Sequence, residues 1–152
     1  MMSESNPIRV FVTHMFSDHA DYHRVFEYLE SASNFFYVNC SNPDAIPTSG
    51  GQQAIKETLA GQIRDAEIVL VISTMHSENR NVIAYEMSVA EEAGIPMIAL
   101  EPFGGLGKVP VEVEARCAEV IAWNERTIVD VIRREARHEE THRWDVVEFD
   151  LS

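Results

Sequence analysis

The sequence predicts an α/β fold of the flavodoxin-like class, a three-layer sandwich around a five-stranded parallel sheet in the order 2-1-3-4-5. Two observations lead to this prediction. Short apolar segments rich in β-branched residues alternate along the chain with segments of helical period, as in parallel sheets covered on both faces. The segment Glu67-Ile-Val-Leu-Val-Ile-Ser73 carries apolar side chains on both faces, as a central parallel strand does. Right-handed crossovers between five such strands favour this strand order.

The periodicity places each element in turn. We expect strands at residues 8–13, 35–40, 67–73, 97–100 and 119–123. We expect a first helix from Ser17 or Asp18, which would cap it, a second ending near Asp65, a third over 79–93, and a last helix after Asn124. Gly94 is placed to end the third of these helices.

Length and composition predict one domain. The 152 residues are 45% hydrophobic and 24% charged, which is typical of a chain with a single core. We expect the domain to span residues 7–137 and an acidic tail to follow at 138–152. No apolar run approaches the roughly 20 residues of a membrane helix, and the start of the chain lacks the features of a signal peptide, so we expect a cytoplasmic protein.

Charge restricts the ligands. Twelve Lys and Arg against 25 Asp and Glu give a formal net charge of −13, which repels the phosphate backbones of nucleic acids. A small anionic nucleotide stays compatible with this charge, because backbone N–H groups can bind it locally.

Motifs of other functional classes are incomplete. Residues 104–108 are glycine-rich, but Val109 stands where a P-loop needs Ser or Thr. His19 and His23 lie four apart, as do His138 and His142, yet neither pair has a cluster of further metal ligands nearby. We therefore expect no metal site.

Glu86 is the most informative residue of the pattern. It lies within the inward stripe of the third helix, four residues after Val82 and four before Ala90, where an unpaired carboxylate is costly. Either it pairs with a cation such as Arg80 or reaches solvent at the edge of the stripe, or it serves a ligand. Parallel sheets bind ligands at the carboxyl ends of strands one and three, which here are residues 13–18 and 73–81. At the first of these ends, Phe16 either packs in the core or stacks on a base or pyridinium ring.

Several segments together resemble TIR-like domains, and most of all the TIR-like proteins of bacterial Thoeris antiphage systems. The resemblance covers residues 8–135. It rests on Arg9-Val-Phe-Val-Thr-His14 with Phe16 and Asp21-Tyr22, on Ala66-Glu-Ile-Val-Leu-Val-Ile72, on Asn81-Val-Ile-Ala-Tyr-Glu86 with Ala90, on Gly94-Ile-Pro96 and on Trp123-Asn124.

The resemblance implies cleavage of the nicotinamide–ribose bond of NAD⁺, with Glu86 as the catalytic residue. NAD⁺ would be the substrate, with no further cofactor. The product, ADP-ribose or a cyclic isomer, would signal to a separate effector protein, and the chain could form a homo-oligomer without binding nucleic acid or membrane. Family members often carry Trp four residues before this Glu, where this chain has Val82. The implied substrate-binding residues are Thr13, His14, Phe16, Asn39, Ser77, Arg80 and Val82.

Two other functions stay open at this point. One is a non-catalytic TIR-like module that recruits partners through homotypic contacts, which Val82 in the place of Trp favours. The other is an enzyme like the nucleoside deoxyribosyltransferases, which share the sheet and use a cleft carboxylate as nucleophile.

Overall fold

The computed structural model describes residues 2–15, 19–105 and 107–139, and its centre is a five-stranded parallel sheet. The strand order is β2-β1-β3-β4-β5, so the predicted flavodoxin-like fold and its topology are confirmed. The strands are β1 (Ile8–Val12), β2 (Tyr37–Asn39), β3 (Ile68–Ile72), β4 (Met97–Leu100) and β5 (Glu119–Ile121).

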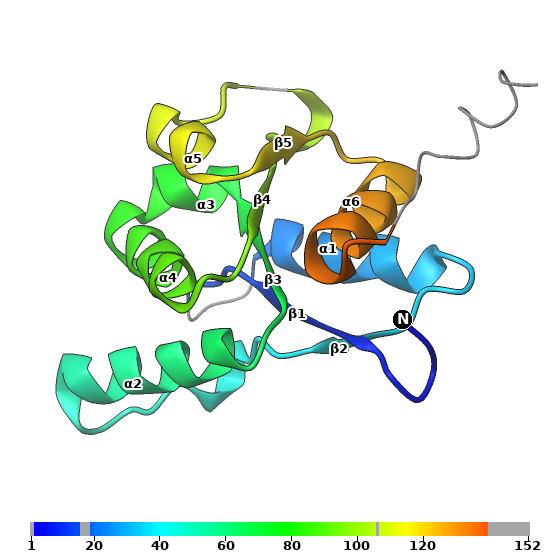
Figure 1. The fold of residues 1–152 in the computed structure, drawn as a ribbon. Coiled ribbons are helices and arrows are strands. Elements are labelled where there is room, and N and C mark those ends of the chain that lie inside the picture. Colours follow the sequence, from blue (N-terminus) through cyan, green and yellow to red (C-terminus); the bar gives the residue numbers. More distant parts are fainter. Residues whose placement is uncertain (1, 16–18, 106, 140–152) are drawn as a thin grey trace, which may run out of the picture.

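Helices cover both faces of this sheet (Figure 1). The α-helices are α1 (Ala20–Ser31), α2 (Gly51–Arg64), α3 (Ser73–Glu78), α4 (Arg80–Ala93), α5 (Val111–Arg116) and α6 (Glu125–Arg137), and the 3₁₀ turns are η1 (Pro43–Ala45) and η2 (Phe103–Gly105). Helices α1 and α6 lie together on one face, whereas α2 and α4 pack against each other on the opposite face. Within the described residues, none of the helices has the length and apolar character needed to cross a membrane.

The core follows the hydrophobic pattern of the sequence. All five residues of β3 are buried, which explains why this strand carries no polar position. Helix α6 buries Ile128, Val129 and Ile132, and the side chain of Asn124 caps it by accepting a hydrogen bond from the N–H of Thr127, both as predicted.

One local prediction is wrong, and two short helices were not predicted. The N-cap of α1 is His19, whose ring accepts from the N–H of Asp21, and neither Ser17 nor Asp18, which lie outside the described residues. Helices α3 and α5, which were not expected, have only six residues each, too few to show a helical period. The non-helical backbone of Asn79 separates α3 from α4, and the bounds of α4 agree with the helix predicted over 79–93. Most of the predicted tail, residues 140–152, also lies outside the described residues.

Candidate functional site

The turn that follows β1 brings two of the predicted site residues into the interior. Thr13 and His14 are 0% and 1% exposed. The hydroxyl of Thr13 accepts a hydrogen bond of 3.0 Å from the N–H of Ile72. The backbone N–H of Thr13 donates to the carbonyl of Leu70. Thr13 therefore joins the carboxyl ends of β1 and β3, and the next residue begins the site.

Glu86 lies on the inner face of α4 and points at this turn. Its carboxyl is completely buried, and Oε1 accepts a hydrogen bond of 3.1 Å from the backbone N–H of His14. Oε2 is also buried and has no hydrogen-bond partner among the described residues. The structure therefore places Glu86 beside the turn after β1 and gives it no ion pair with Arg80 within the described chain.

Burial controls the protonation of Glu86. Removal from water raises the pKa of Glu86 well above its usual value, and the hydrogen bond from the N–H of His14 opposes this rise only in part. The carboxyl therefore favours its neutral form until a positive charge comes close to it. Such an arrangement is typical of a group kept for a ligand.

The imidazole of His14 belongs to the same buried cluster. Its Nε2 lies 3.1 Å from Oε1 of Gln62 on α2, and its ring lies beside the rings of Phe11 and Tyr22. Burial lowers the pKa of His14, and the hydrogen bond with Gln62 opposes this effect. The ring is therefore neutral at physiological pH and adds no cation to the surroundings of Glu86.

Asn39 joins this cluster through Tyr22. The amide of Asn39, at the end of β2, donates a hydrogen bond of 3.2 Å to the hydroxyl of Tyr22 and accepts one from the N–H of Ser41. The ring of Tyr22 meets that of His14 edge-on, with centroids 6.3 Å apart. These contacts connect the carboxyl ends of β1 and β2.

A pocket of about 450 Å³ lies between α2 and α4, the helices that carry Gln62 and Glu86. The predicted site residue Val82 lines it, one helical turn before Glu86, which is itself not among the described lining residues. Lys56 is the one charged residue among the described lining, and the rest of that lining consists of Gln52, Ile55, Leu59, Asn81 and Tyr85. Sequence reasoning missed the contribution of α2, although the four-residue spacing of Ile55 and Leu59 marks the helix face that meets α4.

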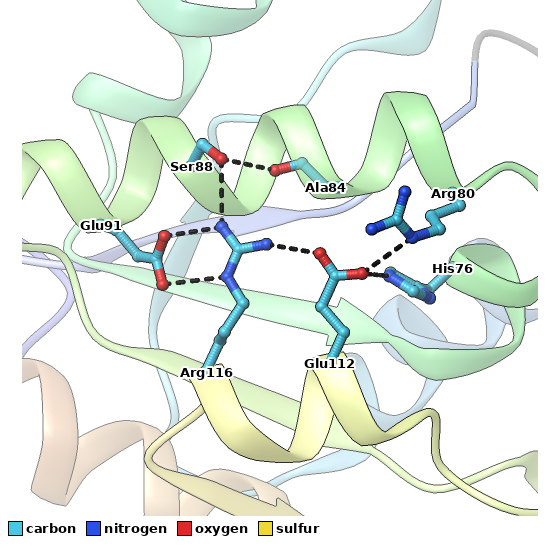
Figure 2. A network of polar contacts seen from close by, with 7 residues as sticks. All are labelled: His76, Arg80, Ala84, Ser88, Glu91, Glu112 and Arg116. Atoms are coloured by element: carbon cyan, nitrogen blue, oxygen red, sulfur yellow. Dashed lines mark hydrogen bonds and ion pairs between the residues drawn. The ribbon is translucent and has the colours of Figure 1, made fainter.

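The structure gives Arg80 and Ser77 other surroundings. The Nε of Arg80 donates a hydrogen bond of 3.0 Å to Glu112 of α5, which also contacts His76 and Arg116 (Figure 2). Ser77 is exposed on α3. The structure shows neither of them in contact with Glu86 or His14 within the described chain. Phe16 lies outside the described residues.

The histidines near the start of α1 have other contacts. His19 caps α1 with Nδ1 and places Nε2 3.1 Å from Oε2 of Glu78, while the ring of His23 lies against that of Tyr22. Over residues 2–15, 19–105 and 107–139, no three His, Cys, Asp or Glu side chains are arranged to hold a metal ion.

Comparison with known families identifies the fold more closely. The family model described as "Thoeris protein ThsB, TIR-like domain" matches residues 11–104, more than half of the chain. The match begins within β1, ends within η2 and includes both His14 and Glu86. No curated protein matches the chain.

Proposed function

The chain belongs to the family of Thoeris ThsB TIR-like domains, and on this premise we propose that it cleaves the nicotinamide–ribose bond of NAD⁺. One observation carries the proposal. Glu86 is a fully buried carboxyl with one oxygen held by a backbone N–H and the other without a partner among the described residues. A protein rarely keeps such a group unless a ligand completes its surroundings.

Cleavage of the nicotinamide–ribose bond requires little more than one carboxylate. When the bond between C1′ of the ribose and the ring nitrogen breaks, its electron pair passes to nicotinamide, which leaves as a neutral molecule and needs no general acid. The ribose becomes an oxocarbenium-like cation, which a carboxylate stabilises electrostatically. Water then adds to C1′ and loses a proton, which gives ADP-ribose. Attack by a nucleophile of the same molecule gives a cyclic isomer with the advantage of proximity.

The electrostatics of Glu86 suit a cationic substrate. The pyridinium ring of NAD⁺ carries the positive charge that the site lacks, so its arrival favours the ionised form of Glu86. In our proposal Oε1 stays on the N–H of His14, and Oε2 receives a hydroxyl of the ribose. The carboxylate is then fixed in place before the cation develops.

In our proposal, the pocket between α2 and α4 binds the rest of the dinucleotide. Because Glu86 has no exposed surface, the ribose reaches it only when neighbouring side chains move. Val82 and Tyr85 line the pocket and lie within one turn of Glu86, so we propose that their movement connects the pocket to the carboxyl. Lys56 would offer its charge to the pyrophosphate.

We also propose a signalling role for the product in antiphage defence. The family match covers TIR-like domains of Thoeris systems. In our proposal the nucleotide product, linear or cyclic, acts on a separate effector protein in the cytoplasm, and a second copy of the chain contributes to assembly.

Nicotinamide release from NAD⁺ by the purified full chain, followed by chromatography, tests the proposal. Glu86→Gln should lower the rate by about 100-fold or more, because the neutral amide does not stabilise the ribose cation. Glu91→Gln is the matched control on the same helix and should change the rate by less than about twofold. Equal turnover by wild type and Glu86→Gln would contradict the proposal. So would a wild-type chain that releases no nicotinamide either alone or with extract of phage-infected cells.

A non-catalytic interaction module is the second candidate, and Val82 in the place where family members often carry Trp favours it. It predicts that the chain self-associates or binds partners without consuming NAD⁺. Glu86→Gln would then leave that binding unchanged.

A further inference from the structure

Gln62 connects two segments that meet at the candidate site. It lies half-buried on α2, and both ends of its amide contact the backbone of Asn42, in the loop that follows β2. Its Oε1 accepts a hydrogen bond of 3.0 Å from the N–H of Asn42, and its Nε2 donates one of 3.1 Å to the carbonyl of the same residue. The side chain of Asn42 in turn caps η1 by accepting from the N–H of Asp44.

These two contacts fix the orientation of the Gln62 amide. If the amide were turned over, its NH₂ group would face the N–H of Asn42 and its oxygen would face the carbonyl, so both hydrogen bonds would be lost. Oε1 is therefore the atom that also faces Nε2 of His14 at 3.1 Å. Since Oε1 can only accept, the proton of the imidazole must lie on Nε2.

We propose that Gln62 is a positioning residue of the site, which holds His14 as the Nε2–H tautomer and ties the His14 turn to the loop at Asn42. The activity part of this inference rests on the proposed NAD⁺ cleavage, whereas the tautomer does not. Gln62 thereby acts on Glu86 through one intermediate, because the backbone N–H of His14 is the hydrogen-bond donor to the carboxyl.

An amide is well suited to this position. Its oxygen accepts from two N–H groups, while its NH₂ group satisfies the carbonyl of Asn42. Being neutral, it fixes the ring without the strong preference for the imidazolium form that a carboxylate would create, which agrees with the lowered pKa of buried His14. His14 then carries no proton on Nδ1 and leaves the positive charge to be supplied by the substrate.

The ¹⁵N chemical shifts of the His14 ring test the tautomer directly. They would be measured on the full chain at about pH 8, above the usual pKa of histidine, with the resonances assigned by comparison with His14→Asn. In the wild type we expect Nε2 in the protonated range and Nδ1 in the unprotonated range. Gln62→Met, which removes the acceptor, should move the proton partly or fully to Nδ1. Gln62→Glu, which keeps an acceptor oxygen, should leave Nε2 protonated.

Gln53→Met is the matched control, because Gln53 lies exposed on the same helix and its amide donates a hydrogen bond to Glu57, away from His14 and Asn42 in sequence. It should change neither the shifts nor turnover. Gln62→Met should slow nicotinamide release by about tenfold, the usual effect of losing an orienting contact. An Nδ1–H tautomer in the wild type, or Nε2 still fully protonated in folded Gln62→Met, would overturn the inference. Because the shifts are measured without NAD⁺, they decide on Gln62 even if the chain consumes no dinucleotide.

Discussion

The two faces of α4 each carry a glutamate, and the surroundings of these two glutamates are opposite. On the outer face, Glu91 accepts two hydrogen bonds from the guanidinium of Arg116, which also contacts Ser88 and Glu112 (Figure 2). These contacts hold the pKa of Glu91 below its usual value. On the inner face, Glu86 is completely buried, has one backbone hydrogen bond and no cation in the described chain, and burial raises its pKa.

The difference shows where this chain accepts a cost in stability. Arg116 forms an ion pair with Glu91, so the chain does provide a cation for a carboxylate that has only a structural role. A buried carboxyl without a cation lowers stability, and such a position is expected at a functional site rather than in an ordinary core. Glu91 on the outer face is therefore the reference with which the stability and pKa of Glu86 on the inner face are compared.

The largest expected effect is a gain in stability on replacing Glu86. Folded Glu86 keeps a proton that the unfolded chain releases above about pH 4.5, so wild-type stability falls as pH rises from there towards the raised pKa. Glu86→Gln avoids this loss. We expect it to be more stable than wild type by about 1–3 kcal/mol near pH 8, with almost no gain near pH 4. Urea unfolding at both pH values measures the difference.

A stability difference independent of pH would show that Glu86 is not held neutral by burial. A lower stability of Glu86→Gln near pH 8 would mean that the carboxylate has a strong partner, as Glu91 has, and would remove the contrast between the two faces.

A smaller effect on stability, this time a loss, is expected on removing the hydroxyl of Thr13. Thr13→Val keeps the shape of the side chain but leaves the N–H of Ile72 without its acceptor in a fully buried place. We expect a loss of about 1–2 kcal/mol in the free energy of unfolding. Thr13→Ser keeps the hydroxyl and should lose less than half as much. If Thr13→Val is as stable as wild type, the hydroxyl does not stabilise the junction of β1 and β3.

The smallest effect is expected on the outer face. Glu91→Gln weakens a partly exposed pair with Arg116, which solvent screens, so we expect a loss of about 0.5–1 kcal/mol near pH 7. Because the pKa of Glu91 is lowered on folding, the loss should fade as pH drops through that lowered pKa. It should also shrink in high salt. Unfolding curves at two salt concentrations check this, and a gain in stability instead would place Glu91 in the same class as Glu86.

The fold and the position of Glu86 could be predicted from the sequence, because both depend on local periodicity. Alternating apolar segments gave the strand order, and the inward stripe of α4 placed Glu86 in the interior. What could not be predicted arises from contacts between distant segments. The partnership of Gln62 with Asn42 and His14 leaves no periodic signal. The spacing of Ile55 and Leu59 marks the inner face of α2, but it does not show that a pocket forms where this face meets α4. The network around Arg116 depends on α5, a helix too short to be recognised.

The most direct test of the central claim is an NMR titration of the side-chain carboxyl carbons of Glu86 and Glu91 in the wild-type chain. It would be run alone and with an NAD⁺ analogue that resists cleavage but keeps the pyridinium charge. We predict that Glu86 titrates well above Glu91, and that the analogue lowers the apparent pKa of Glu86 while leaving that of Glu91 in place. A Glu86 that titrates at or below its usual value, or that does not respond to the analogue, would contradict the account.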